Sequence, residues 1–317
     1  MDTSAADPVR GGRLPPAATV LGIGGGPLGG LFRHVPEEDA VAAVERAWGA
    51  GLRLFDVAPL YGHGRAERLM GAVLRTKPRA SYVLSTKVGR LLRERGEREP
   101  TGFVDADPVQ PVFDYSADGV RRSLEESLVR LGVDRVDVVL IHDPEQHLDQ
   151  ALVEAQQALV RLRDEGMVGA VGVGTNFAAT VARFAREADI DCALLAGRIT
   201  LLEKSGLEEA LPLCAERGIS VVAGGVFNSG ILADASPGGT YDYARADDET
   251  RGRVAVLRQR CAVHGVPLTA AALRYPLRHA AVSAVVVGVR SADEVDANVA
   301  AFATDIPDAL WAELDDV

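Results

Sequence analysis

Residues 54–62 read Leu-Phe-Asp-Val-Ala-Pro-Leu-Tyr-Gly, and this stretch is the strongest indication of the fold. Its apolar start is typical of a buried β-strand, and a carboxylate, Asp56, stands near the strand's end. A phenol, Tyr61, follows five residues later, across a turn that contains a proline. The stretch therefore predicts a strand end that supplies two polar side chains to one place.

Two later apolar runs end in a similar way. Lys87 follows the run 81–86, and His142 follows the run 136–141. In a (β/α)8 barrel the C-terminal ends of all strands meet at one face, where catalytic residues collect. We therefore expect Asp56, Tyr61, Lys87 and His142 to share one site.

Apolar runs and helical patterns alternate from about residue 18 to about residue 303. The expected strands are 19–24, 53–57, 82–86, 136–141, 168–173, 192–196, 219–223 and 282–287. The expected helices are 36–48, 65–74, 116–131, 148–165, 178–188, 206–217, 251–264 and 292–303. Alternation of this kind predicts parallel βαβ units, and eight units favour a closed (β/α)8 TIM barrel of class α/β over a doubly wound sheet.

The domain organisation expected from the sequence is simple. The length of 317 residues suits one barrel domain, which we place at residues 18–317, after a flexible leader at 1–17. Two connections are longer than usual βα loops, 89–115 and 224–248. Long loops of this kind are often binding loops or lids, and mobile insertions are the alternative.

Composition narrows the classes of function. The chain is 47% hydrophobic and 25% charged, and its 34 basic and 45 acidic residues give a net charge of 34 − 45 = −11. This balance argues against binding to nucleic acid or to an anionic membrane surface. The three cysteines show no metal-ligand or disulfide spacing, and no signal-peptide or membrane-span pattern occurs, so we expect a cytoplasmic protein without a metal. The sequence does not indicate the oligomeric state.

The four candidate side chains form a coherent chemical set. A free phenol has a pKa near about 10, which is too high for an efficient acid or base near neutrality. A neighbouring ammonium, here Lys87, would lower the pKa of Tyr61, and Asp56 would hold the ammonium in place. His142 could orient a substrate oxygen. This set predicts proton transfer at an alcohol or carbonyl oxygen, and a redox reaction would need a hydride cofactor.

The chain also resembles a known family, the aldo-keto reductases, from about residue 18 to about residue 303. The resemblance rests on LGIGGGPLGG (21–30), GLRLFDVAPLYGHGRAE (51–67), STKVG (85–89), IHDP (141–144) and VGVGTNF (171–177). It implies a (β/α)8 barrel that binds an extended nicotinamide cofactor. It also implies that Asp56, Tyr61, Lys87 and His142 are the family's catalytic tetrad, with Tyr61 as the acid/base.

The resemblance further assigns residues to cofactor binding. They are Gly24, Gly25, Asp56, Thr175, Asn176, Phe227, Asn228, Ser229, Gly288, Arg290, Glu294 and Asn298. Thr175 and Asn176 match positions that bind the nicotinamide amide. Two positions depart from the family, because Ala196 stands where glutamine is common and Gly224 stands where an aromatic ring often stacks.

The segment 288–298 bears on the choice between NAD and NADP. Members that prefer NADPH carry a lysine and an arginine at the positions matched by Gly288 and Glu294. A carboxylate would repel the 2′-phosphate of NADP and could accept a hydrogen bond from a ribose hydroxyl. Arg290 would act in the opposite direction. We therefore expect NAD or NADP as cofactor, with NAD favoured.

Within the family, the segments LAGRITLLE (195–203) and VFNSGIL (226–232) resemble a branch of sugar 1-dehydrogenases. That branch contains L-fucose, D-threo-aldose and L-galactose dehydrogenases and a similar pyridoxal 4-dehydrogenase. The resemblance implies oxidation of a small-molecule aldose at C1 to its lactone. The alternatives are an aldehyde or ketone reductase, a pyridoxal dehydrogenase, and a non-catalytic nucleotide-binding redox sensor.

Overall fold

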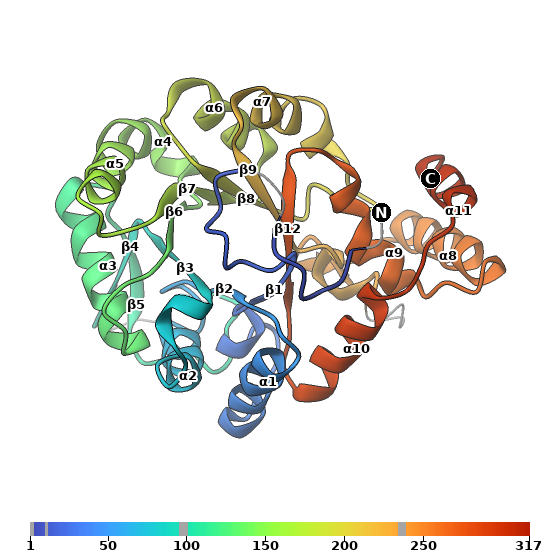
Figure 1. Cartoon of the computed structure of the whole chain (residues 1–317), viewed down its shortest axis with the longest axis horizontal. Coiled ribbons are helices and arrows are strands. Elements are labelled where there is room, and N and C mark those ends of the chain that lie inside the picture. The colour runs from blue at the N-terminus through green and yellow to red at the C-terminus, as the bar shows by residue number, and fades with distance from the viewer. Residues whose placement is uncertain (1–2, 10–11, 95–100, 234–238) are drawn as a thin grey trace.

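The computed structural model describes residues 3–9, 12–94, 101–233 and 239–317. Eight parallel strands form a closed barrel in the order β1-β12-β9-β8-β7-β6-β3-β2. They are β1 (Leu21–Gly24), β2 (Leu54–Asp56), β3 (Val83–Val88), β6 (Val138–His142), β7 (Ala170–Thr175), β8 (Cys192–Ala196), β9 (Ser220–Gly224) and β12 (Val282–Gly288). The predicted (β/α)8 barrel is confirmed, with all eight strands where the apolar runs place them (Figure 1).

Helices cover the outside of the barrel. The α-helices are α1 (Glu37–Gly49), α2 (Arg65–Leu74), α3 (Ala117–Leu131), α4 (Leu148–Gln150), α5 (Gln156–Asp164), α6 (Ala178–Glu187), α7 (Ala210–Arg217), α8 (Asp248–Val263), α9 (Leu268–Arg274), α10 (Ala292–Phe302) and α11 (Asp308–Asp315). The short helices are η1 (Pro27–Gly29), η2 (Arg79–Ser81), η3 (Glu145–His147), the π-helical η4 (Ala151–Ala155), η5 (Ser205–Leu207), η6 (Asn228–Gly230) and η7 (Tyr275–Arg278). The helix expected at 148–165 is thus divided into α4, η4 and α5, and α9 and α11 were not expected.

Local sequence explains where several helices begin. Ser116 caps α3 by accepting a hydrogen bond from the Gly119 amide at 3.1 Å. Ser291 caps α10 in the same way, through the Glu294 amide at 3.3 Å. These side chains satisfy amides that have no partner within the helix. The two caps therefore set where the preceding loop ends and the helix begins.

The barrel interior is filled by small and branched side chains from the strands. They are Leu54, Val83, Val138, Leu140, Ala170, Cys192, Leu194, Val222, Ala284 and Val286. Leu14 and Ala18 from the N-terminal segment join this cluster and are buried. Figure 1 shows this segment, in dark blue, crossing the opening of the ring of strands.

The described residues of the segment 1–17, which we expected to be a flexible leader, make contacts with the barrel. The Arg13 amide donates to Ser220 Oγ at 2.6 Å, and Pro8 pairs with Thr19. Its described residues pack against one end of the barrel, because Leu14 closes the apolar interior there. The parts of the leader at 1–2 and 10–11 lie outside the described residues.

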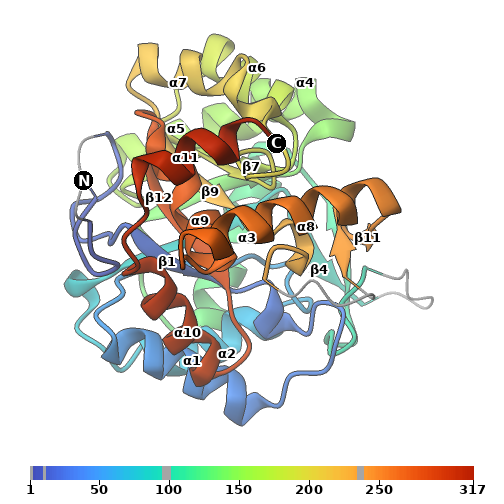
Figure 2. The same cartoon turned by 90° about the vertical axis from the view of Figure 1, so that its right-hand side faces the viewer.

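The two long connections each contain a β-hairpin that the sequence did not predict. The first is β4 (Arg90–Arg93) with β5 (Gln110–Phe113), and the second is β10 (Thr240–Tyr241) with β11 (Ala244–Arg245). In Figure 2 these hairpins lie at the end of the barrel opposite the N-terminal segment. This is the end where the candidate residues are. Residues 95–100 and 234–238 of these connections lie outside the described residues.

Candidate active site

The turn after β2 places Asp56 and Tyr61 at the same end of the barrel. Asp56 is the last residue of β2 and is 3% exposed. The turn is seated against η1, where Gly62 and Gly29 approach so closely that a Cβ on either would lie 2.6 Å from a backbone atom of the other. Gly62 also has a φ of 62°, a conformation that favours glycine. Glycine at both positions therefore sets where the phenol of Tyr61 lies.

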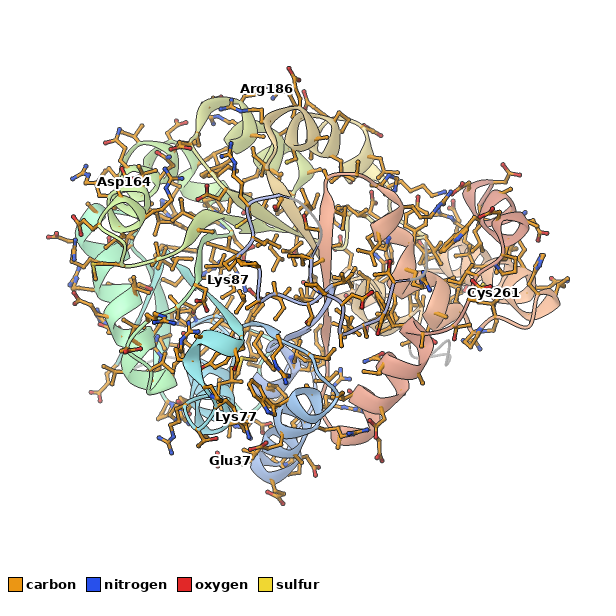
Figure 3. The ribbon with its side chains drawn as sticks, in the orientation of Figure 1. Glu37, Lys77, Lys87, Asp164, Arg186 and Cys261 are labelled. Carbon is orange, nitrogen blue, oxygen red and sulfur yellow. The ribbon has the colours of Figure 1, made fainter. Side chains whose placement is uncertain are left out.

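Lys87 joins Asp56 to Tyr61. Its side chain is 1% exposed, and Figure 3 shows it within the ring of strands. Its Nζ donates to Asp56 Oδ2 at 2.6 Å, to the Val57 carbonyl at 3.1 Å and to Tyr61 Oη at 3.1 Å. An ammonium has three hydrogens, so these contacts use its full donor capacity. The result is a buried chain of carboxylate, ammonium and phenol.

The ionisation of Lys87 follows from these contacts. Burial lowers the pKa of Lys87, but Asp56 and the oxygen of Tyr61 raise it by more, so the net pKa lies above the ordinary value. Asp56 is held in turn by Ser85, whose hydroxyl donates to Oδ1 at 2.9 Å. Lys87 is therefore a cation at neutral pH, fixed next to the phenol.

The phenol itself differs from the expectation. Desolvation by burial raises the pKa of Tyr61 to about 12, although Lys87 lowers it. We expected the ammonium to bring the pKa of Tyr61 below that of a free phenol, but burial of the phenol has the larger effect. Tyr61 is thus a protonated phenol at neutral pH, ready to donate a proton.

His142 completes the set at the end of β6. The centroid of its ring lies 5.8 Å from that of the Tyr61 ring, and the two ring planes are at 88° to each other. Its backbone carbonyl accepts from the Tyr115 hydroxyl at 2.7 Å and from Arg90 at 3.3 Å. Burial, Arg90 and Lys87 lower the pKa of His142 well below the usual value, so the imidazole is neutral. A neutral imidazole can donate a hydrogen bond to a substrate oxygen from one nitrogen.

The glycine run after β1 lies beside this set. Gly25 donates to the Asp56 carbonyl at 2.7 Å, and a Cβ there would lie 3.0 Å from Val57, so packing alone explains this glycine. A Cβ on Gly24 would be no closer than 3.8 Å to other atoms of the described chain, and one on Gly26 would meet none of them within 4 Å. Gly26 therefore borders open space, which fits a bound group, whereas a Cβ on Gly24 would make ordinary contact with the end of β12.

Thr175 and Asn176 are placed differently from each other. Thr175 is buried, and its hydroxyl donates to Glu145 Oε1 at 2.5 Å. That hydroxyl therefore has no proton left for a nicotinamide amide. Asn176 donates from Nδ2 to the hydroxyl of Tyr243 at 3.1 Å. The turn of the hairpin β10–β11 thus contacts Asn176, which we predicted to bind the cofactor.

Two residues assigned to the cofactor have unsatisfied polar atoms. Among the described residues, the buried side-chain atoms without a hydrogen-bond partner are Asn228 Oδ1, Arg290 Nε and His279 Nε2. Buried polar atoms without partners are uncommon in proteins and call for an explanation. A polar ligand across Asn228 and Arg290 would supply the missing partners, so these positions fit an extended dinucleotide.

The remaining assigned residues lie around the same end of the barrel. Phe227 and Ser229 flank Asn228 in and before η6, and Ser229 Oγ accepts from the Tyr243 amide at 2.9 Å. Gly288 ends β12, where a Cβ would lie 2.6 Å from Pro27. Asn298 lies on α10, one turn after Glu294. Ala196 and Gly224, the two departures from the family, are paired neighbours at the ends of β8 and β9.

Glu294 occupies the start of α10. Its Oε2 accepts from the Arg290 amide at 2.8 Å, and its Oε1 lies 3.1 Å from Arg33 and 3.5 Å from the Arg290 side chain. The carboxylate therefore satisfies a backbone amide near the helix start and is partly balanced by two cations. Arg33 is not among the residues that we predicted to lie near Glu294.

Sequence reasoning missed several residues at this end. Arg90 is the first residue of the first hairpin, Tyr115 follows that hairpin, and Tyr243 lies in the turn of the second. Nothing in their local sequence marks them, because the hairpins bring them to the site. Asp143 is different, since it stands next to His142 in the IHDP motif.

Comparison with known proteins identifies the family. The Aldo/keto reductase family model matches residues 20–317. The chain belongs to the aldo/keto reductase family. It is therefore an oxidoreductase, and members of this family use NAD(P)H.

Three of the relatives are named as sugar or pyridoxal dehydrogenases. The chain is 44% identical to a D-threo-aldose 1-dehydrogenase of Pseudomonas sp, over 94% of this chain and 93% of the relative. It is 43% identical to a pyridoxal 4-dehydrogenase of Microbacterium luteolum, over 96% and 95%. It is 31% identical to an L-galactose dehydrogenase of Arabidopsis thaliana, over 89% and 84%.

Solved structures share the fold. A holo-form aldo-keto reductase from Bacillus halodurans matches with a TM-score of 0.77 and 25% identity, covering 98% of this chain and 95% of the other. A glycerol dehydrogenase from Gluconobacter oxydans has the same TM-score at 22% identity, again covering 98% and 95%, which is evidence for the fold alone. Within the described residues, the helices are too short or too polar to span a bilayer.

Proposed function

We propose that this aldo/keto reductase is an NAD-dependent aldose 1-dehydrogenase that oxidises a cyclic hemiacetal, of the L-fucose, L-galactose or D-arabinose type, to its lactone. The hydrogen-bonded chain Asp56–Lys87–Tyr61, with His142 beside it, carries the proposal, since it is built to move one proton at a substrate oxygen. The similarity to aldose and galactose dehydrogenases supports the sugar.

In the proposed reaction Tyr61 receives the proton of the anomeric hydroxyl. The C1–H bond breaks at the same time, its electron pair leaves C1 as hydride, and the carbonyl of the lactone forms. The nicotinamide, when bound, supplies the hydride acceptor. Lys87 stabilises the phenolate that Tyr61 must become before it accepts a proton, and Asp56 keeps Lys87 charged and in place. His142 donates to the anomeric oxygen and orients it.

A second candidate is oxidation of pyridoxal, which forms an internal hemiacetal. It is favoured by the 43% identity to a pyridoxal 4-dehydrogenase, almost equal to that of the aldose relative. The same residues would perform the same steps on an aromatic hemiacetal. Reduction of a plain aldehyde or ketone is the reverse reaction at the same site.

The experiment that separates these substrates follows NADH formation with L-fucose, L-galactose, D-arabinose and pyridoxal, and NADH consumption with simple aldehydes. We expect at least one sugar to have a higher kcat/KM than pyridoxal or any aldehyde. A preference for pyridoxal would replace the proposal by the second candidate. Turnover of aldehydes alone would replace both by a reductase.

The pKa of Tyr61 predicts how the reaction depends on pH. Oxidation needs the phenolate, and at a pKa of about 12 its fraction rises about tenfold for each pH unit below that value. We therefore expect kcat/KM for oxidation to rise with pH from about 7 to about 10, while reduction, which needs the phenol, stays flat. A steady-state profile in both directions measures this. Oxidation that is independent of pH over this range would exclude Tyr61 as the base.

The preference for NAD is assigned to Glu294. A carboxylate near the 2′-position would repel the phosphate of NADP by about 1 kcal/mol through water. Glu294→Gln keeps an acceptor for the Arg290 amide but removes the charge. We expect the variant to raise kcat/KM for NADP about fivefold and to change that for NAD little. The assignment fails if the wild-type enzyme already uses NADP as well as NAD.

A further inference from the structure

Asp143 lies next to the tetrad and has no role in the steps above. Its Oδ2 is 3.4 Å from His142 Nε2 and accepts from Arg90 at 3.2 Å. Its side chain is 32% exposed, whereas that of His142 is 8% exposed. The carboxylate therefore borders both the imidazole and the open end of the site.

The backbone of Asp143 is held in a conformation that residues other than glycine seldom adopt. Its φ is 41°, and its amide donates to the Gly174 carbonyl at 3.0 Å. The Tyr115 hydroxyl contacts the carbonyls of both His142 and Asp143, at 2.7 and 2.9 Å. Strain of this kind persists only where surrounding contacts impose it, and such residues cluster at binding sites. The contacts here turn the carboxylate toward the imidazole.

The carboxylate keeps hydrogen-bonding capacity for a ligand. It is an acceptor with two oxygens, and Arg90 donates to only one of them. Among the described residues no hydrogen bond reaches Asp143 Oδ1. The ring of Phe103 also lies beside that of Tyr61, with ring centroids 6.1 Å apart, and offers an apolar surface. A hydrogen-bond acceptor beside His142 and an aromatic ring beside Tyr61 suit a polyhydroxylated ring.

We propose that Asp143 binds the substrate hydroxyl on the carbon next to the reacting carbon, and so selects hydroxylated substrates. This inference rests on the proposed function and adds a residue that recognises a hydroxyl of the sugar. His142 Nε2 and Asp143 Oδ2 are 3.4 Å apart. The two side chains are therefore close enough to contact oxygens on neighbouring carbons of one sugar ring. A carboxylate can only accept, so it prefers a hydroxyl to a hydrogen at that carbon.

The test pairs an enzyme variant with a substrate analogue. Each sugar that the enzyme oxidises is compared with its 2-deoxy analogue, for the wild-type protein and for Asp143→Asn. Asparagine tolerates a positive φ well, so the variant should fold. Asp143→Gly also suits that φ and removes the side chain altogether. Asp107→Asn is the matched control, because Asp107 is also partly exposed (26%) and its carboxylate pairs with an arginine, Arg68, instead of bordering a side chain of the tetrad.

We expect the wild-type enzyme to lose about 10- to 100-fold in kcat/KM on the 2-deoxy sugar, as for a hydrogen bond to a charged group. Asp143→Asn and Asp143→Gly should lose most of this preference, mainly through a higher KM for the full sugar. Asp107→Asn should keep it.

Two results would overturn the inference while leaving the proposed function intact. One is a variant that keeps the wild-type preference for the full sugar over its 2-deoxy analogue. The other is an equal loss on both sugars, which would mean that Asp143 only positions His142. If the wild-type enzyme oxidises no sugar, the proposed function fails, and the inference fails with it.

Discussion

Tyr61→Phe should lower kcat about 10²- to 10⁴-fold, the usual contribution of a positioned acid or base. Phenylalanine fills the same space and keeps the ring contacts with His142 and Phe103. It removes only the hydroxyl that Lys87 contacts at 3.1 Å, which in the proposed reaction exchanges the proton with the substrate. Cofactor binding should stay nearly unchanged, which titration of NADH fluorescence measures.

Tyr82→Phe is the control for this variant. Tyr82 is equally an aromatic with a hydroxyl, it is 1% exposed, and its hydroxyl donates to the Leu74 carbonyl at 3.0 Å, outside the site. Loss of that hydrogen bond should cost about 1 kcal/mol of stability and leave kcat unchanged. Substantial activity in Tyr61→Phe would show that another group moves the proton.

Lys87→Met should be damaging to both stability and activity. The ammonium is 1% exposed and lies 2.6 Å from Asp56, whose side chain is 5% exposed. Removal of one partner leaves an uncompensated buried charge, which typically costs about 3–5 kcal/mol. The phenolate of Tyr61 also loses its cation. Denaturant unfolding should show the loss of stability, and steady-state assays the loss of turnover.

A double variant separates the two effects. In Lys87→Met/Asp56→Asn neither charge is buried alone, and asparagine can still accept from Ser85. We expect most of the lost stability to return, because replacing both partners of a buried pair is often nearly neutral. Activity should stay low, since Tyr61 still lacks its ammonium. Recovery of activity together with stability would mean that Lys87 serves folding alone.

The barrel could be predicted from the sequence because its signal is local. Most strands are short apolar runs rich in Val, Ile and Leu, and residues such as Asp56, Lys87 and His142 stand at or next to the strand ends. A parallel strand covered on both faces needs such a run wherever it lies in the chain. The position of the tetrad then follows from topology.

The features that could not be predicted from the sequence depend on contacts between segments that are far apart in the chain. Leu14 fills the barrel interior only because Gly12 and Arg13 fit against Ser220, about two hundred residues away. Tyr243 reaches Asn176 only through the turn of a hairpin. The predicted direction of the pKa shift of Tyr61 was also wrong. Burial of the phenol raises its pKa by more than Lys87 lowers it, and that burial cannot be inferred from the spacing of residues in the sequence.

The site at Asp143 could be predicted from the sequence only in part. Asp143 can be seen in the IHDP motif, but its proposed role depends on a φ of 41° and on the hydroxyl of Tyr115, which only the folded chain brings together.

The most direct measurement of the central claim uses an aldose that carries deuterium at C1. The wild-type enzyme should transfer the deuterium to NAD, form the corresponding lactone in equal amount, and show a slower turnover than with the protium sugar. Tyr61→Phe, with cofactor bound, should transfer almost none. Absence of deuterium from the reduced cofactor, or full transfer by Tyr61→Phe, would contradict the account.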